Sequence, residues 1–234
     1  MPGVLLVHGF TSHPRLTMGV LADELRRSGF AVAQPALRGH GTSPEDLEGV
    51  RFQDWLDDAY AAYQALPEPR SVVGLSMGGL VAAWVAADLG AEALVALAPA
   101  LGFKNPLARL APLLAGVVPR FGGGSSIRDP ELRRRSPNYP WFPTRAFVEL
   151  LRLARHTREV LPRVRAPALV VAAEYDTVVP RRAVLEYYRR LGSERKRFRV
   201  LADSGHDLLL DRQAETAARM VRDYLARRLG EPGG

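Results

Sequence analysis

Short apolar runs alternate with amphipathic segments along most of the chain. Six runs have the length of a strand: 4–8, 30–35, 70–75, 93–98, 167–173 and 196–201. Most of them are apolar at consecutive positions, which is typical of strands buried on both faces of a sheet. Five segments between them have the length and periodicity of helices: 15–28, 51–65, 77–89, 181–191 and 211–229. The alternation predicts an α/β fold in which helices flank a mainly parallel sheet, with Asp211 as the N-cap of the last helix.

One long stretch departs from this alternation. Between Pro99 and Pro167 the pattern predicts helices near 104–118 and 143–160 but no strand. The stretch is far longer than a crossover helix requires, so we expect a helical cap, residues 100–160, inserted after the fourth strand. The core of the fold then comprises residues 1–99 and 161–234, and core and cap form a single compact domain. The glycines at 122–124 predict a flexible linker inside the cap.

Composition and charge narrow the classes of function. The 234 residues are 47% hydrophobic, as in ordinary globular proteins, and the lack of cysteine excludes disulfides and thiolate chemistry. The formal net charge of +7 comes from 32 basic and 25 acidic residues, with arginines spread over many segments. A basic surface attracts phosphate, but no reader motif or aromatic-lined groove accompanies the charge. We therefore expect an arginine-rich surface and no nucleic-acid partner.

The cellular location is predicted from the apolar segments. The N-terminus, MPGVLLVHGF, lacks the basic start and the long apolar stretch of a secretory signal. No charge-free run of about 18 apolar residues predicts a membrane-spanning helix. We expect a cytoplasmic protein.

The sequence VVGLSMGG, residues 72–79, lies between a predicted strand and a predicted helix. In that context G-x-S-x-G is the nucleophile elbow, which presents a serine at the tip of a sharp turn. A residue larger than glycine at 74 or 78 would collide with the neighbouring turn. The pattern therefore predicts Ser76 as a nucleophile, with a helix N-terminus directed at the site.

A serine nucleophile needs a histidine base, and that histidine needs a carboxylate to hold its tautomer. His206 directly follows the last predicted strand and should emerge at the same sheet edge as Ser76. Asp176 follows the preceding strand, with Glu174 as its rival, and Asp207 is interpreted as solvated or structural. The order serine, aspartate, histidine is the one that this type of site uses.

An ester-cleaving serine also needs two backbone donors for the oxyanion. We expect one of them to be the N–H group of Met77, directly after the nucleophile. The other should be the N–H group of Phe10, in the loop after the first strand, where His8 is expected to order the loop through a hydrogen bond.

Five segments together resemble the α/β-hydrolase superfamily, in particular its small bacterial carboxylesterases and monoacylglycerol lipases. They are LLVHGFTSHP (5–14), PALRGHGTSPEDL (35–47), VGLSMGG (73–79), EYDTVVP (174–180) and DSGHD (203–207). The resemblance implies the same triad of Ser76, Asp176 and His206, and the same oxyanion amides. Relatives often begin with an antiparallel hairpin before the first buried strand. We therefore expect one sheet edge of this protein to be shorter, or to be covered by a second copy, as in a homodimer.

The expected activity is cleavage of carboxylic esters, with short or medium acyl chains or in monoacylglycerols, through an acyl-enzyme. No metal or organic cofactor is needed, because the triad supplies both nucleophile and proton carrier. We expect the substrate, a small-molecule ester, to contact five apolar residues: Phe10, Phe103, Leu107, Trp141 and Phe142. The alternatives are a thioesterase, acyltransferase or peptidase with the same triad, or a non-catalytic binding member of the fold.

Overall fold

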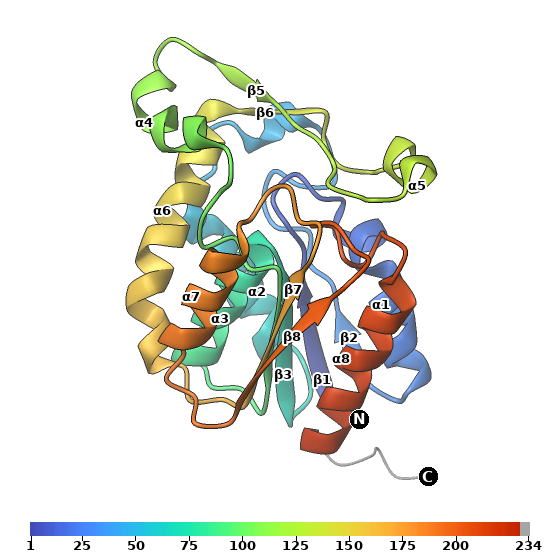
Figure 1. Ribbon diagram of the computed structural model, residues 1–234. Coiled ribbons are helices and arrows are strands. Elements are labelled where there is room, and N and C mark those ends of the chain that lie inside the picture. Colours follow the sequence, from blue (N-terminus) through green and yellow to red (C-terminus); the bar gives the residue numbers. More distant parts are fainter. Residues whose placement is uncertain (230–234) are drawn as a thin grey trace.

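A six-stranded parallel sheet forms the centre of the protein in the computed structural model, which describes residues 1–229 (Figure 1). Its strand order is β2-β1-β3-β4-β7-β8. The bounds are β1 Gly3–Val7, β2 Ala31–Ala33, β3 Arg70–Leu75, β4 Leu94–Leu97, β7 Ala168–Ala173 and β8 Lys196–Leu201. All five pairings in this sheet are parallel, so the carboxyl ends of the strands meet at one edge. The predicted α/β fold is confirmed.

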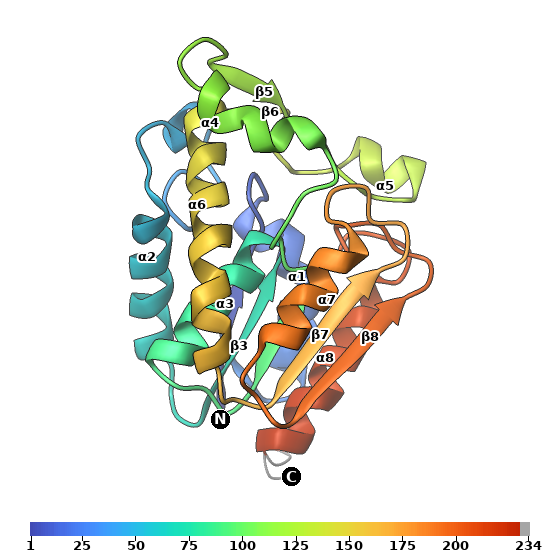
Figure 2. The ribbon, with the colours of Figure 1, turned by 60° about the vertical axis from the view of Figure 1, so that its left-hand side comes forward.

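Helices cover both faces of the sheet (Figures 1 and 2). One face carries α1 (Pro14–Arg27) and α8 (Ala214–Leu229), and the other carries α2 (Phe52–Gln64), α3 (Met77–Asp88), α6 (Thr144–Val160) and α7 (Arg181–Arg190). In β1, Val4 and Leu6 pack under α1 and α8, whereas Leu5 and Val7 pack on the opposite side. Burial of both faces is the reason that the strands are apolar at consecutive positions. No helix within residues 1–229 has the length and apolar character needed to cross a membrane.

The segment between β4 and β7 differs from its prediction. Besides α6, it contains the 3₁₀ helices η2 (Pro106–Leu110) and η3 (Leu161–Arg163), the short helices α4 (Ala111–Leu114) and α5 (Pro130–Arg134), and the strands β5 (Arg120–Gly122) and β6 (Trp141–Pro143). One further 3₁₀ helix, η1 (Pro44–Leu47), lies outside the segment. The expectation of no strand is wrong, because β5 and β6 pair antiparallel, with Phe121 opposite Phe142. Strands of three residues are too short to produce a recognisable period. The single helix expected at 104–118 is likewise replaced by two short helices, η2 and α4.

This segment lies beyond the carboxyl ends of the strands, at the top of Figure 1. Its last helix, α6, extends down beside α3, where Trp84 Nε1 donates to Thr157 Oγ1 over 3.1 Å. Thus α6 belongs partly to the layer that covers the sheet. The division into a cap, 100–160, and a core, 1–99 and 161–234, stays a prediction, and residues 230–234 of that core lie outside the described residues.

Two local predictions are wrong. The carboxylate of Asp211 does not cap α8, which begins at Ala214; it accepts the N–H groups of Gly205 at 2.7 Å and Arg128 at 2.6 Å. The glycines at 122–124 are not a free linker either, because Gly122 ends a paired strand and Gly123 N donates to Pro140 O over 2.8 Å.

Candidate active site

The turn between β3 and α3 has the geometry of a nucleophile elbow. Ser76 has φ 56° and ψ −114°, a left-handed conformation that side chains rarely adopt. A Cβ atom on Gly74 would overlap the carbonyl oxygen of Gly78, and one on Gly78 would overlap that of Val7. The spacing of the two glycines around the serine therefore follows from the tightness of the turn.

The predicted base lies beside this serine. His206 Nε2 is 2.7 Å from Ser76 Oγ, and both side chains are largely buried. His206 follows β8 and Ser76 follows β3, so the common edge of the parallel sheet brings them together.

The predicted acid completes a chain of hydrogen bonds. Asp176 Oδ2 is 2.7 Å from His206 Nδ1, and Asp176 Oδ1 accepts the N–H groups of Val178 and Val179 at 2.8 and 2.7 Å. The rival, Glu174, is exposed and pairs with Arg181 at 3.2 Å. Of the two carboxylates, only Asp176 contacts the histidine.

The electrostatics of the pair set the protonation states. Burial alone lowers the pKa of His206, but the charge and hydrogen bond of Asp176, with a further contribution from Asp207, raise it above its ordinary value. For Asp176, burial alone would raise the pKa. The charge and hydrogen bond of His206 and the two backbone N–H groups have a larger effect in the opposite direction, so the pKa of Asp176 is lowered. Asp176 is therefore ionised at neutral pH and accepts a hydrogen bond from the Nδ1 proton of the ring. In the neutral form of the ring, Nε2 is then the acceptor toward Ser76.

The loop after β1 lies against the serine. A Cβ atom on Gly9 would come within 3.3 Å of Ser76 Cβ. His8 holds this loop, since its Nδ1 is 2.9 Å from Gly9 O and its Nε2 accepts Leu37 N over 3.2 Å. Burial lowers the pKa of His8 to about 4, so the ring is neutral and suits this pair of contacts. The loop therefore brings the backbone of Phe10 near the nucleophile.

A cavity of about 390 Å³ opens above Ser76 and His206. Four of the five predicted contact residues line it: Phe10, Phe103, Leu107 and Phe142. Aromatic rings form much of the wall; the ring centroids of Phe142 lie 5.2 Å from those of Phe10 and 5.5 Å from those of Phe147. Polar groups line another part of the wall: Thr11, Ser12, Asn105, Ser125, Ser126, Asn138, Thr177 and Asp207.

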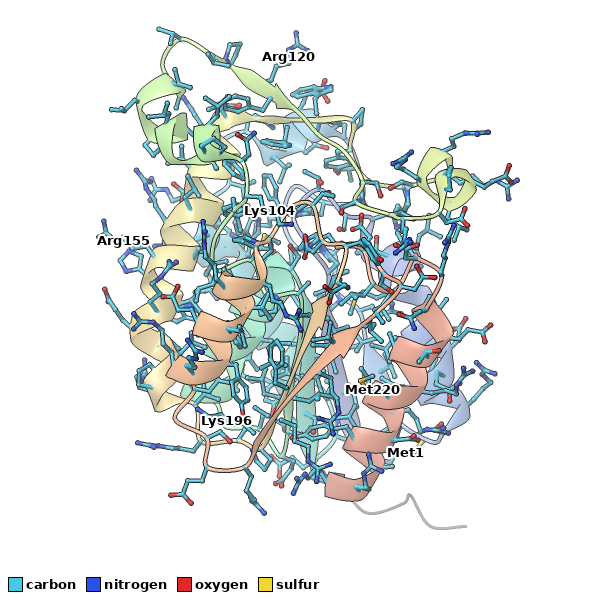
Figure 3. The ribbon with its side chains drawn as sticks, in the orientation of Figure 1. Met1, Lys104, Arg120, Arg155, Lys196 and Met220 are labelled. Atoms are coloured by element: carbon cyan, nitrogen blue, oxygen red, sulfur yellow. The ribbon has the colours of Figure 1, made fainter. Side chains whose placement is uncertain are left out.

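Trp141 is not among the residues that line this cavity. Successive side chains of a strand point to opposite faces, so on β6 Phe142 faces the cavity and Trp141 faces away. The guanidinium of Arg120 lies 5.0 Å from the centre of the Trp141 ring. Figure 3 shows Arg120 at the outer end of the molecule, far from the six-stranded sheet.

Sequence reasoning missed several lining residues, Phe121, Ser126 and Asn138 among them. Phe121 could have been found only from its pairing with Phe142, which no periodicity indicated. Within residues 1–229, no group of three or more histidine, aspartate or glutamate side chains is placed to hold a metal ion.

Comparisons with known proteins identify the family of the chain. Residues 2–213 match the family described as serine aminopeptidase, S33. A thermostable monoacylglycerol lipase from Bacillus sp. (strain H-257) is 30% identical over 97% of this chain and 92% of its own length. A carboxylesterase from Bacillus subtilis (strain 168) is 23% identical over 95% and 91% of the two lengths.

Solved structures are similar as well. A structure reported for LipS and LipT, two metagenome-derived lipolytic enzymes, has a TM-score of 0.90 and 29% identity, over 96% of this chain and 93% of that one. The monoacylglycerol lipase of Paleococcus ferrophilus has a TM-score of 0.81 and 20% identity, over 97% and 94%, which supports the fold. The chain belongs to the S33 family of α/β-hydrolases. It is an enzyme, a hydrolase of the esterase- and lipase-like type.

Proposed function

We propose that this protein hydrolyses carboxylic esters with short or medium acyl chains, or monoacylglycerols, through an acyl-enzyme intermediate. The observation that carries the proposal is the hydrogen-bonded series Ser76, His206 and Asp176 at the base of a cavity with phenylalanine walls. Nucleophile and base are in contact, the base is oriented by an acid, and an apolar slot adjoins them.

The proposed mechanism uses the three side chains of this series and two backbone N–H groups. Ser76 Oγ attacks the ester carbonyl while His206 Nε2 takes the hydroxyl proton, and Asp176 stabilises the imidazolium. The N–H groups of Phe10 and Met77 hold the oxyanion. His206 then gives its proton to the departing alcohol, and the acyl group stays on the serine. A water molecule, deprotonated by the same ring, then attacks the acyl group; the carboxylic acid leaves, and the ring returns its proton to Ser76 Oγ.

The segment 100–160 acts as the cap in this proposal. A serine at the edge of an uncovered sheet would face bulk water, and the segment supplies Phe103, Phe142 and Phe147 above it. Each methylene that an acyl chain buries contributes about 0.8 kcal/mol. The names of the relatives, a monoacylglycerol lipase and a carboxylesterase, support ester substrates.

The alternatives differ in the bond that is cleaved. The family description, an aminopeptidase, favours amides as substrates. The same triad can also hydrolyse thioesters or catalyse acyl transfer. A non-catalytic binding role would predict a broken triad, whereas all three side chains are joined at 2.7 Å. Hydrolysis of esters agrees best with the apolar wall. The cytoplasmic location, the homodimer and the absence of a nucleic-acid partner stay predictions.

The test is a matched series of substrates. Hydrolysis of p-nitrophenyl and glyceryl esters of increasing acyl length is measured beside thioesters and peptide amides of the same acyl groups. We expect kcat/KM to rise a few-fold per methylene until the cavity is filled and then to level off. A higher kcat/KM for the amides or thioesters than for the matched esters would replace the proposal by the corresponding alternative.

A further inference from the structure

The hydroxyl group of Ser126 lies between the two loops that carry the acid and the base. Ser126 Oγ accepts the N–H group of His206 and that of Thr177, each over 3.2 Å. It also lies 2.7 Å from the hydroxyl of Thr177, with which it forms a further hydrogen bond. Thr177 is adjacent to Asp176 in the chain. This one side chain, 80 residues before His206 and 51 before Thr177, thus contacts the backbone of the base itself and of the residue that follows the acid.

The backbone of Ser126 is held at the histidine loop as well. Ser126 N donates to Asp207 Oδ2 over 3.0 Å, and Ser126 O accepts Asp207 N over 3.2 Å. A Cβ atom on Gly205 would overlap the carbonyl oxygen of Ser126, so the two backbones approach as closely as glycine allows. The sequence predicts that Asp207 is solvated or structural; in the structure it is buried, and it holds the backbone of Ser126 through these hydrogen bonds.

A second buried carboxylate continues the attachment. Asp211 Oδ2 accepts the N–H groups of Arg128 and Gly205 at 2.6 and 2.7 Å, and Oδ1 accepts Asp129 N at 3.2 Å. The stretch 126–129 is therefore bound to the stretch 205–211 by backbone and side-chain hydrogen bonds together. The position of Ser126 is fixed with respect to His206.

We infer that Ser126 is a positioning residue, which aligns His206 with Asp176 by holding the backbone of both loops on one hydroxyl oxygen. The inference rests on the proposed function, since it concerns the same acid–base pair. Two of the hydroxyl's hydrogen bonds come from buried or part-buried N–H groups that would otherwise lose their acceptor. When the acceptor is lost, the two loops can separate, and the 2.7 Å contact between Asp176 and His206 becomes longer and less populated.

The central variant is Ser126→Ala. We expect kcat to fall roughly tenfold with KM nearly unchanged, because alignment of the pair matters most in the transition state. The groups that raise the pKa of the His206 ring are Asp176 and Asp207. A looser contact with Asp176 should lower the pKa of His206 toward its ordinary value, as read from NMR titration of the ring.

A matched control separates alignment from a general loss of stability. Thr157 is fully buried on α6, and its hydroxyl also makes two hydrogen bonds, to Trp84 Nε1 and Leu153 O. We expect Thr157→Val to lower the unfolding midpoint while leaving kcat and the pKa of His206 as in the parent. If Ser126→Ala behaves like Thr157→Val, with unchanged kcat and histidine pKa, Ser126 has no positioning role.

A double-mutant cycle gives the second test. In the Asp176→Asn background, alignment with the acid has already been lost, so Ser126→Ala should lower kcat by less than twofold further. A full tenfold further loss would overturn the inference, since Ser126 would then act independently of Asp176. If Ser126→Ala does not fold, Ser126→Cys, which keeps the shape with a weaker acceptor, is measured in its place.

The two proposals fail in different ways. If the parent protein has no ester turnover that depends on Ser76, the proposed function is wrong. The NMR titration of His206 needs no substrate, so it still decides whether Ser126 aligns the pair.

Discussion

His206 Nε2 lies 2.7 Å from Ser76 Oγ, although 130 positions separate the two residues in the chain. At this distance a neutral imidazole can take the hydroxyl proton as the oxygen attacks. Ser76→Ala removes the hydroxyl and keeps a small side chain at the elbow. We expect kcat/KM for esters to fall by roughly 10³-fold or more, with the unfolding transition close to that of the parent. A fluorophosphonate probe should label the parent only; labelling of another serine in both proteins would contradict the assignment.

The acid is tested by a pair of isosteric changes. Asp176→Asn replaces the oxygen that accepts the His206 Nδ1 proton, and the wrong tautomer is favoured. We expect a loss of about 10²- to 10⁴-fold in kcat. Glu174→Gln is the matched control, because the Glu174 side chain is exposed and forms an ion pair with Arg181. An active Asp176→Asn together with an inactive Glu174→Gln would reverse the assignment.

The rate should depend on pH through His206. Its ring must be neutral to accept the serine proton, so activity is lost as pH falls through the pKa of the ring. Because Asp176 raises that pKa, the rise of kcat/KM with pH should lie above the ordinary histidine value of about 6.5. His206→Gln should abolish the activity at every pH. A pH profile with its midpoint well below 6 would show that the pair is not coupled in the free enzyme.

Acid should destabilise the fold through a different histidine. Burial lowers the pKa of His8 to about 4. Between about pH 6.5 and pH 4, this side chain therefore binds a proton in the unfolded chain but not in the folded chain. The contribution of His8 to the free energy of unfolding is therefore fully present above pH 6.5. It decreases by about 3 kcal/mol as the pH falls to about 4. Urea unfolding at several pH values measures it. His8→Gln keeps an acceptor for Leu37 N and should have a smaller pH dependence; an unchanged dependence would assign the effect elsewhere.

The acyl preference should change at Phe103. This side chain and Ala108 line both the cavity above Ser76 and a second cavity of about 380 Å³. Phe103→Ala should join the two cavities and move the optimum of the ester series to longer acyl chains, with the pH profile unchanged. Leu113→Ala is the control, because Leu113 is 80% exposed. If the preferred acyl length is the same in Phe103→Ala and Leu113→Ala, the acyl chain does not bind against Phe103.

The parts of the site at the sheet edge could be predicted because few interactions determine them. A parallel sheet brings the carboxyl ends of its strands to one edge, so the positions of Ser76, Asp176 and His206 directly after predicted strands indicate that they meet there. The glycines around Ser76 follow from a turn that leaves no room for a side chain. Local sequence determines these features.

The segment above the sheet could not be predicted in this way. Its shape depends on partners far away in the chain, such as Asp207 for Ser126 and Asp211 for Arg128. Asp211 resembles an N-cap in the sequence, but its oxygens accept N–H groups from other loops. Trp141 and Phe142 are equally apolar, and only the register of β6 decides which of them reaches the cavity.

The backbone of Ser76 has a consequence for the natural variation of this protein. At φ 56° and ψ −114°, a serine is strained by roughly 1–3 kcal/mol where a glycine would be relaxed. Selection for thermal stability alone would therefore favour the loss of the nucleophile at this position. Retention of the serine has to be enforced by selection for turnover. A lineage released from that selection would gain stability at position 76 by becoming inactive.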